Sequence, residues 1–118
     1  MKPNDLIPIK FINLTPHAIK EVNSGLTIPP SGEVARVSVV YKSVAYKKVS
    51  EKAGIPFFKA EYGEVEGIPA PQPSVLYIVS GLVFEATDRT DVIAPGELVR
   101  DKDGKPIGCN GFKTKTIL

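Results

Sequence analysis

The sequence is poor in the residues that most often build catalytic and metal centres, with one cysteine and one histidine in 118 residues. A single cysteine cannot form a disulfide within the chain, which is typical of proteins from a reducing compartment. Cys109 and His17 together supply only two ligands, too few for a structural zinc site. No other spacing matches a catalytic, metal-binding or phosphate-binding signature. The sequence therefore predicts neither a metal nor a cofactor.

Long apolar runs are also absent. The opening MKPNDLIPIKF contains two prolines and an acid where a signal peptide has an apolar core, and no segment approaches the roughly 18 consecutive apolar residues of a membrane helix. We therefore expect a cytoplasmic protein that makes no membrane contact. The formal net charge of +2 is too small to require a polyanionic partner. Sparse cysteine and methionine beside abundant lysine, glutamate and proline favour a thermophilic source.

The composition is that of one soluble globular domain over residues 1–118, with 42% hydrophobic and 24% charged residues and no internal repeat. Eleven prolines and ten glycines interrupt the chain too often for helices of average length, and their spacing suits short strands. The sequence predicts a mainly β fold, a small barrel or sandwich of mostly antiparallel strands. An α+β fold is the alternative.

Alternating or continuous apolar segments bounded by turn residues predict the individual strands. These segments are 7–14, 18–22, 26–28, 33–46, 57–67, 75–79, 92–94, 97–100 and 106–112. Ser80 can cap a short helix near 80–87, and a single helical turn is expected within 47–53. In the 33–46 strand, Tyr41 belongs to a uniformly apolar set that predicts a buried face. Pro95-Gly96 predicts a tight turn.

Charge is densest in residues 88–109, DRTDVIAPGELVRDKDGKPIGC. Asp103-Gly104 between apolar segments is a strong hairpin signal. A calcium loop is the alternative, but the further acids that an EF-hand needs are missing. Asp88 and Asp91 flank Arg89, which indicates either a polar site capable of acid–base chemistry or an Asx loop held by an Arg–Asp contact. The Asx loop is the simpler interpretation.

Cys109 lies in an expected strand, where a lone cysteine is usually a small buried apolar residue. A nucleophilic cysteine needs a base, and His17 is the one histidine. Nothing in the sequence indicates that the two meet. For His17, which follows Pro16 in a turn, the simpler expectation is a side chain that bonds the loop backbone.

Lysines and aromatic residues alternate in the middle of the chain, as they do in proteins that bind single-stranded nucleic acid. The residues concerned are Tyr41, Lys42, Tyr46, Lys47, Lys48, Lys52, Phe57, Phe58 and Lys59. Neighbouring glutamates dilute the charge. A solvated, lysine-rich strand edge that discourages aggregation is the alternative interpretation.

Three segments carry a resemblance: NLTPHAI, VLYIVSGLV and RTDVIAPGELVRDKDGKPIGCNGF. They resemble a family of small proteins from bacteria, archaea and their viruses that open with an Asn-Leu-Thr-Pro-His motif. The match spans most of the chain and is weakest between Val39 and Ile55. The resemblance implies a phage or prophage setting and no particular activity. If the motif residues are functional, the candidates are Thr15, His17, Arg89, Asp91, Arg100, Asp101 and Cys109.

The sequence thus favours a non-enzymatic binding or interaction module with a protein partner. The family resemblance adds a viral or prophage origin to this expectation. One alternative is a small enzyme whose site gathers His17, Arg89, Asp91 and Cys109. Another is a nucleic-acid-binding protein that uses the basic segment from Lys42 to Lys59. An unpaired edge strand would also allow a homo-oligomer.

Overall fold

The computed structural model describes residues 8–44 and 54–115. Within these residues the chain forms eight strands and one helix. In order they are β1 (Lys10–Asn13), β2 (Ile19–Lys20), β3 (Thr27–Ile28), β4 (Arg36–Val44), β5 (Phe57–Glu66), β6 (Val75–Ile78), α2 (Gly81–Ala86), β7 (Val92–Arg100) and β8 (Pro106–Thr114).

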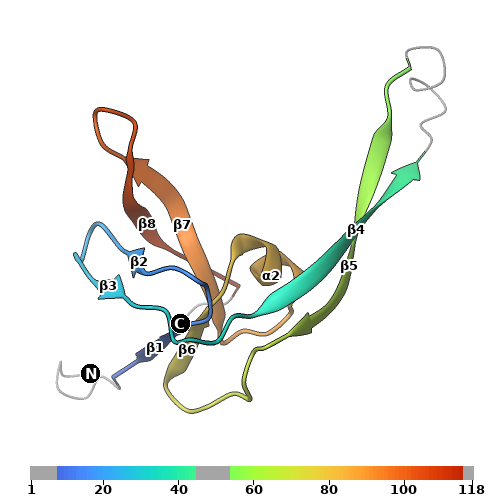
Figure 1. The fold of residues 1–118 in the computed structure, drawn as a ribbon. Coiled ribbons are helices and arrows are strands. Elements are labelled where there is room, and N and C mark those ends of the chain that lie inside the picture. The colour runs from blue at the N-terminus through green and yellow to red at the C-terminus, as the bar shows by residue number, and fades with distance from the viewer. Residues whose placement is uncertain (1–7, 45–53, 116–118) are drawn as a thin grey trace.

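The centre of the molecule is a four-stranded sheet in the order β1-β6-β7-β8 (Figure 1). β1 and β7 both run parallel to β6, whereas β8 returns antiparallel to β7 through a hairpin. All four residues of β6 are buried, as a continuous apolar run predicts for a central strand.

The side chains of β6 alternate between two cores because successive residues of a strand point to opposite faces. Tyr77 and its neighbours at 75 and 79 pack against α2 and the base of β4 and β5. Leu76 and Ile78 pack on the other face, against β2 and β3 through Ile19 and Ile28. Two thin layers therefore cover the central sheet, one on each side.

The hairpin of β4 and β5 projects away from this body, and α2 lies at its base (Figure 1). Among the strands that the structure describes, these two pair with each other alone. We call its outer part, residues 39–44 and 57–62, the arm. The projection makes the molecule long, 64 × 40 × 31 Å with a radius of gyration of 18.3 Å, where a compact chain of this length has about 13–14 Å.

The mainly β fold and the short helix are confirmed. The Ser80 side chain caps α2 by accepting a hydrogen bond from the backbone N–H of Val83. The sheets do not close into a barrel, and the central sheet is mixed. The helical turn expected within 47–53 lies outside the described residues. No helix in the described ranges has the length and apolar character needed to cross a membrane.

The tight turn predicted at Pro95-Gly96 is wrong, because β7 continues through both residues. Gly96 is required for a different reason. A Cβ there would collide with the carbonyl oxygen of Asn110 on the facing strand β8. The glycine allows two backbones to approach closely, which is a requirement that its own sequence neighbourhood does not display.

Candidate interaction surface

The Asn-Leu-Thr-Pro-His motif forms the loop after β1, and Asn13 organises it. The Asn13 side chain is 1% exposed. Its Oδ1 accepts hydrogen bonds from the backbone N–H and the hydroxyl of Thr15, at 2.9 and 2.7 Å. Its Nδ2 donates to the carbonyl oxygens of His17 and Ile28, at 2.8 and 3.1 Å. The His17 ring is left on the exposed side of this loop, so the polar contacts of the motif hold the backbone.

Arg89 and Asp91 form a bidentate ion pair at the start of β7. Arg89 Nε lies 2.9 Å from Asp91 Oδ1, and Nη2 lies 2.6 Å from Oδ2. These bonds lower the pKa of Asp91 and raise that of Arg89. The guanidinium also lies 5.6 Å from the ring centre of the buried Tyr77. A carboxylate held ionised in this way is a weak proton acceptor, and the pair closes one end of the core.

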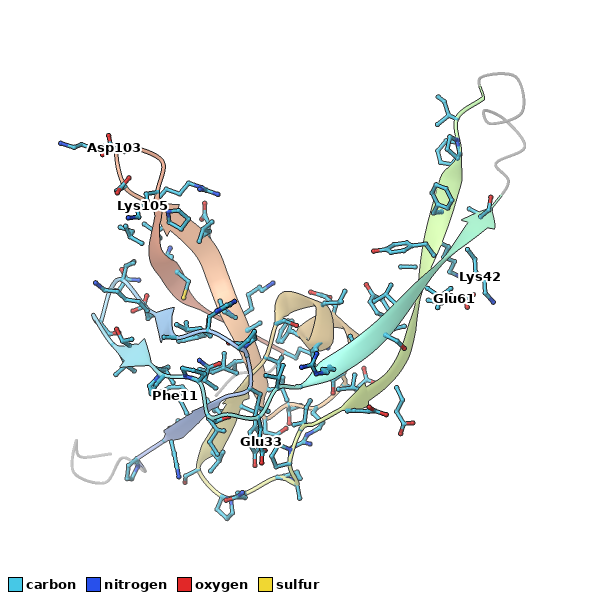
Figure 2. All side chains as sticks on the ribbon, in the orientation of Figure 1. Phe11, Glu33, Lys42, Glu61, Asp103 and Lys105 are labelled. Atoms are coloured by element: carbon cyan, nitrogen blue, oxygen red, sulfur yellow. The ribbon has the colours of Figure 1, made fainter. Side chains whose placement is uncertain are left out.

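Arg100 and Asp101 shape the turn between β7 and β8, and the predicted hairpin is confirmed. Asp101 Oδ1 accepts from the backbone N–H groups of Asp103 and Lys105, both at 2.9 Å. Arg100 Nη1 donates to the carbonyl oxygen of Gly104 at 2.8 Å. Asp103 and Lys105 lie at the outer tip of this hairpin (Figure 2). In residues 8–44 and 54–115, no three His, Cys, Asp or Glu side chains gather as metal ligands.

Cys109 is 5% exposed in the middle of β8. Burial raises the pKa of its thiol, and the nearby Glu21 carboxylate raises it further. Glu21 is itself anchored by the backbone N–H groups of Gly111 and Ser24 and by the Asn23 amide. These bonds lower the pKa of Glu21 to about 2. A thiol kept protonated beside an ionised carboxylate is a weak nucleophile.

The structure separates Arg89 and Asp91 from Cys109. Arg89 and Asp91 precede β7, whereas Cys109 pairs with Leu98, about 20 Å further along that strand. His17 lies in the loop after β1. No hydrogen bond or ion pair in the described ranges joins His17 to either of the other two groups. The Arg89–Asp91 pair and Cys109 thus occupy distinct places, each with local structural contacts.

The arm exposes an aromatic surface that includes Tyr41, which the sequence analysis placed on a buried face. Residues directly opposite in an antiparallel pair share a face, and the register joins Val39 to Tyr62, Tyr41 to Ala60 and Ser43 to Phe58. We call these six residues the aromatic face. Tyr41, Phe58 and Tyr62 are 66%, 60% and 47% exposed. The prediction that Tyr41 is buried is wrong, because no second layer of the described chain covers this part of the hairpin.

The opposite face of the arm is mixed in character. Lys42 pairs directly with Lys59 in the register, and Val40 with Glu61. Lys42 Nζ and Glu61 Oε2 form a 3.0 Å ion pair (Figure 2). Lysines and tyrosine rings therefore point to opposite sides of the hairpin, since neighbouring strand residues alternate. Tyr46, Lys47 and Lys48, the remaining nucleic-acid candidates, lie outside the described residues.

An open cleft of about 690 Å³ lies where the arm leaves the body. Leu14, Val34 and Leu82 line its apolar part, and Glu64 and Glu66 contribute carboxylates. Of the hairpin residues that line it, Val37 has the strand parity of the aromatic face, whereas Arg36, Ser38 and Glu66 have the parity of the opposite face. The cleft therefore lies at the base of the β4–β5 hairpin and is lined by residues from both of its faces.

Comparisons with family models, curated proteins and solved structures gave no match. The family resemblance carried by the Asn-Leu-Thr-Pro-His motif stays a prediction.

Proposed function

We propose that this protein is a non-enzymatic interaction module that binds a protein partner through the aromatic face of the arm. The observation that carries the proposal is the joint exposure of Tyr41, Phe58 and Tyr62 on one side of a two-stranded hairpin. Aromatic side chains supply much of the binding energy in protein interfaces. The separation of the polar candidate residues also favours binding over catalysis.

The energetics of the hairpin support the same proposal. A two-stranded hairpin without a packed face is marginally stable in water. Of its residues within 36–44 and 57–66, Val37 and Val65 at the base pack on the core. Covering the aromatic face with a partner would remove apolar surface from water and stabilise the extended conformation. The required partner surface is apolar at its centre and able to lie flat on two strands.

Site-specific photo-crosslinking tests this proposal. A benzophenone amino acid is placed at Tyr41 and, as a matched control, at Leu98, which is 52% exposed on the β7–β8 hairpin. In a native lysate, position 41 is expected to give discrete crosslinks to a second copy or to one other protein, and position 98 to give none. The crosslinks from position 41 should disappear when Phe58 is changed to Ser. Identical crosslinking patterns from positions 41 and 98 would contradict the proposal.

Nucleic-acid binding is the second candidate, favoured by exposed Tyr41 and Phe58 on the hairpin that carries Lys42 and Lys59. Because the rings and lysines lie on opposite faces, the two candidates respond differently to substitution. Protein binding depends mainly on the rings. Nucleic-acid binding requires the lysines and weakens steeply with salt, which fluorescence anisotropy with single-stranded oligonucleotides measures. For the protein itself, whichever partner it binds, we also propose a cytoplasmic location and a prophage origin, and both rest on the sequence.

A further inference from the structure

We infer that the partner docks by adding an extended segment, as a third strand, to the open edge of β4 beside the aromatic face. This inference rests on the proposed function, because it states how the partner of that face is bound. The backbone of β4, the contrast between the two strands of the arm and the charges of β4 each bear on it.

The backbone of β4 has an unused edge. Within residues 8–44 and 54–115, β4 pairs with β5 and with no other strand, and its residues make no further backbone hydrogen bond. The N–H and C=O groups of alternate β4 residues therefore point outward without a partner in these residues. Another extended backbone satisfies such a row of groups at its own spacing. The geometry of the edge thus selects an extended segment as its occupant.

The two edges of the arm differ, and the edge of β4 is the better template. The register shifts beside Val39, where one residue of β4 faces two of β5, Gly63 and Glu64. Such a bulge interrupts the β5 edge and discourages pairing there. β4 has no extra residue and contains neither glycine nor proline, and four of its nine residues are valine, which favours strands.

A third strand would also stabilise the arm. A two-stranded hairpin is marginally stable in water, whereas three strands with an apolar face can be stable. Alternate side chains of the added segment would lie on the same side as Tyr41. Apolar residues at these positions would widen the aromatic face, which the rest of the partner then covers.

The charges that would face an added strand are positive. Side chains directly opposite each other in neighbouring strands interact. The charged residues of β4 are Arg36 and Lys42, on the face turned away from the aromatic face, and β4 contains no acid. Their acidic neighbours Glu66 and Glu61 belong to β5, roughly 10 Å from an added strand, where salt screens them. The added segment should therefore alternate apolar residues with polar ones that include acids.

The edge stays accessible at the base of the arm. Arg36 and Ser38 of β4 line the open cleft of about 690 Å³, so there is space beside this part of the strand as well. Leu14 and Leu82, on the body side of the cleft, offer contacts to an apolar side chain of the segment.

Peptide binding to the purified full chain, followed by fluorescence anisotropy, tests the inference. The probe is a labelled peptide that alternates glutamate and valine and has the nine-residue length of β4. Two N-methyl groups on neighbouring residues block both edges of this peptide, and binding should be lost. Two N-methyl groups on alternate residues block one edge, because successive N–H groups of a strand point to opposite edges. This matched control should bind within about threefold of the unmethylated peptide, since either strand direction can pair.

A charge exchange locates the peptide at β4. A peptide that alternates lysine and valine should bind the wild type about tenfold more weakly, because like charges directly opposite each other are destabilising. The double substitution Arg36→Glu and Lys42→Glu should reverse this preference, which a folding defect could not do. Lys59→Glu is the matched control on β5 and should keep the preference of the wild type.

Three results would overturn the inference: no binding of the unmethylated peptide, equal binding of the two methylated peptides, or a charge preference that follows Lys59 in place of Arg36 and Lys42. The photo-crosslinking experiment separates the two proposals. Crosslinks from position 41 without peptide binding leave the proposed function standing and remove strand addition. The absence of both crosslinks and peptide binding removes both proposals.

Discussion

Asn13 lies in the tight space between the end of β1 and the end of β3, where its amide bonds polar groups of three other residues. The backbone carbonyl of Ile28 is fifteen positions away in sequence and receives one of these bonds. Buried carbonyl and N–H groups that lose their partner cost more than the bond itself contributed. The loop therefore depends on this one side chain.

Replacing Asn13 with alanine should lower the free energy of unfolding by about 2–4 kcal/mol, because several buried polar groups lose their partner at once. Urea unfolding followed by far-ultraviolet circular dichroism measures this difference. His17→Ala, in the same motif but with an exposed ring, is the control and should change stability by less than about 0.5 kcal/mol. A larger loss in His17→Ala than in Asn13→Ala would contradict this assignment.

Among single residues, the sequence analysis selected His17, Arg89 and Cys109 as functional candidates, because their side chains can take part in more kinds of chemistry than an asparagine can. Asn13 carried a usable signal as well, since an asparagine two positions before a threonine is typical of an Asx turn. The bond from Asn13 to the carbonyl oxygen of Ile28 was not predictable, because Ile28 reaches Asn13 only after the chain has folded. The Arg89–Asp91 contact was predictable, since both partners lie within one loop.

Among the elements, the turn between β2 and β3 is fastened to β8 by Glu21. Its carboxylate accepts hydrogen bonds from Ser24 on its own turn and from Gly111 on β8. Cys109 of β8 also accepts a bond, at its carbonyl oxygen, from the backbone N–H of Val22. The small hairpin therefore covers one core of the central sheet by polar contacts at its edge as well as by Ile19 and Ile28.

This junction should make stability depend on acid pH. The folded pKa of Glu21, about 2, lies below its ordinary value of 4.5, so folding favours the ionised carboxylate. Its contribution is complete above about pH 4.5 and is lost as the pH falls toward 2. Glu21→Gln should melt at a lower temperature than the wild type at neutral pH, and the difference should shrink at the acid end. Thermal melts from neutral to acid pH measure it, and a constant difference would contradict the prediction.

Elements with local signals were predictable: β6 from its apolar run, α2 from its serine cap, and the β7–β8 hairpin from Asp103-Gly104. The pairing of β1 with β6 was not, since strand patterns specify a face and give no partner. Gly96 illustrates the same difficulty. Its neighbour Pro95 makes the pair resemble a turn, and the actual constraint comes from Asn110 on another strand.

At the scale of the whole molecule, the body and the arm are separable units of packing. Both cores consist of residues outside the arm, and the described part of the hairpin packs on the core through Val37 and Val65. An apolar strand face has the same sequence pattern whether its own chain or another chain covers it. Composition therefore predicted a globular chain and gave no indication that one hairpin leaves the body.

Removing the arm should leave the body folded. Residues 39–62 are replaced by Asn-Gly, which favours a tight hairpin turn, so that Ser38 and Gly63 end the shortened strands. We expect a cooperative thermal transition within about 5 °C of the wild type, because few core contacts are lost. Circular dichroism measures the transition. Loss of a cooperative transition would show that the body requires the arm.

The connectivity of the sheet also sets an order of events during synthesis. β1 cannot pair with β6 until Val75, the partner of Lys10, has been synthesised. β4 and β5 are neighbours along the chain, and closing such a hairpin takes microseconds. The arm thus emerges complete while β6, on which both cores depend, is still to be made. Because the uncovered arm is only marginally stable, we expect its amides to gain lasting protection no earlier than those of β1 in pulsed hydrogen exchange during refolding. A chain whose synthesis has passed the arm therefore exposes the aromatic face before it can form either core.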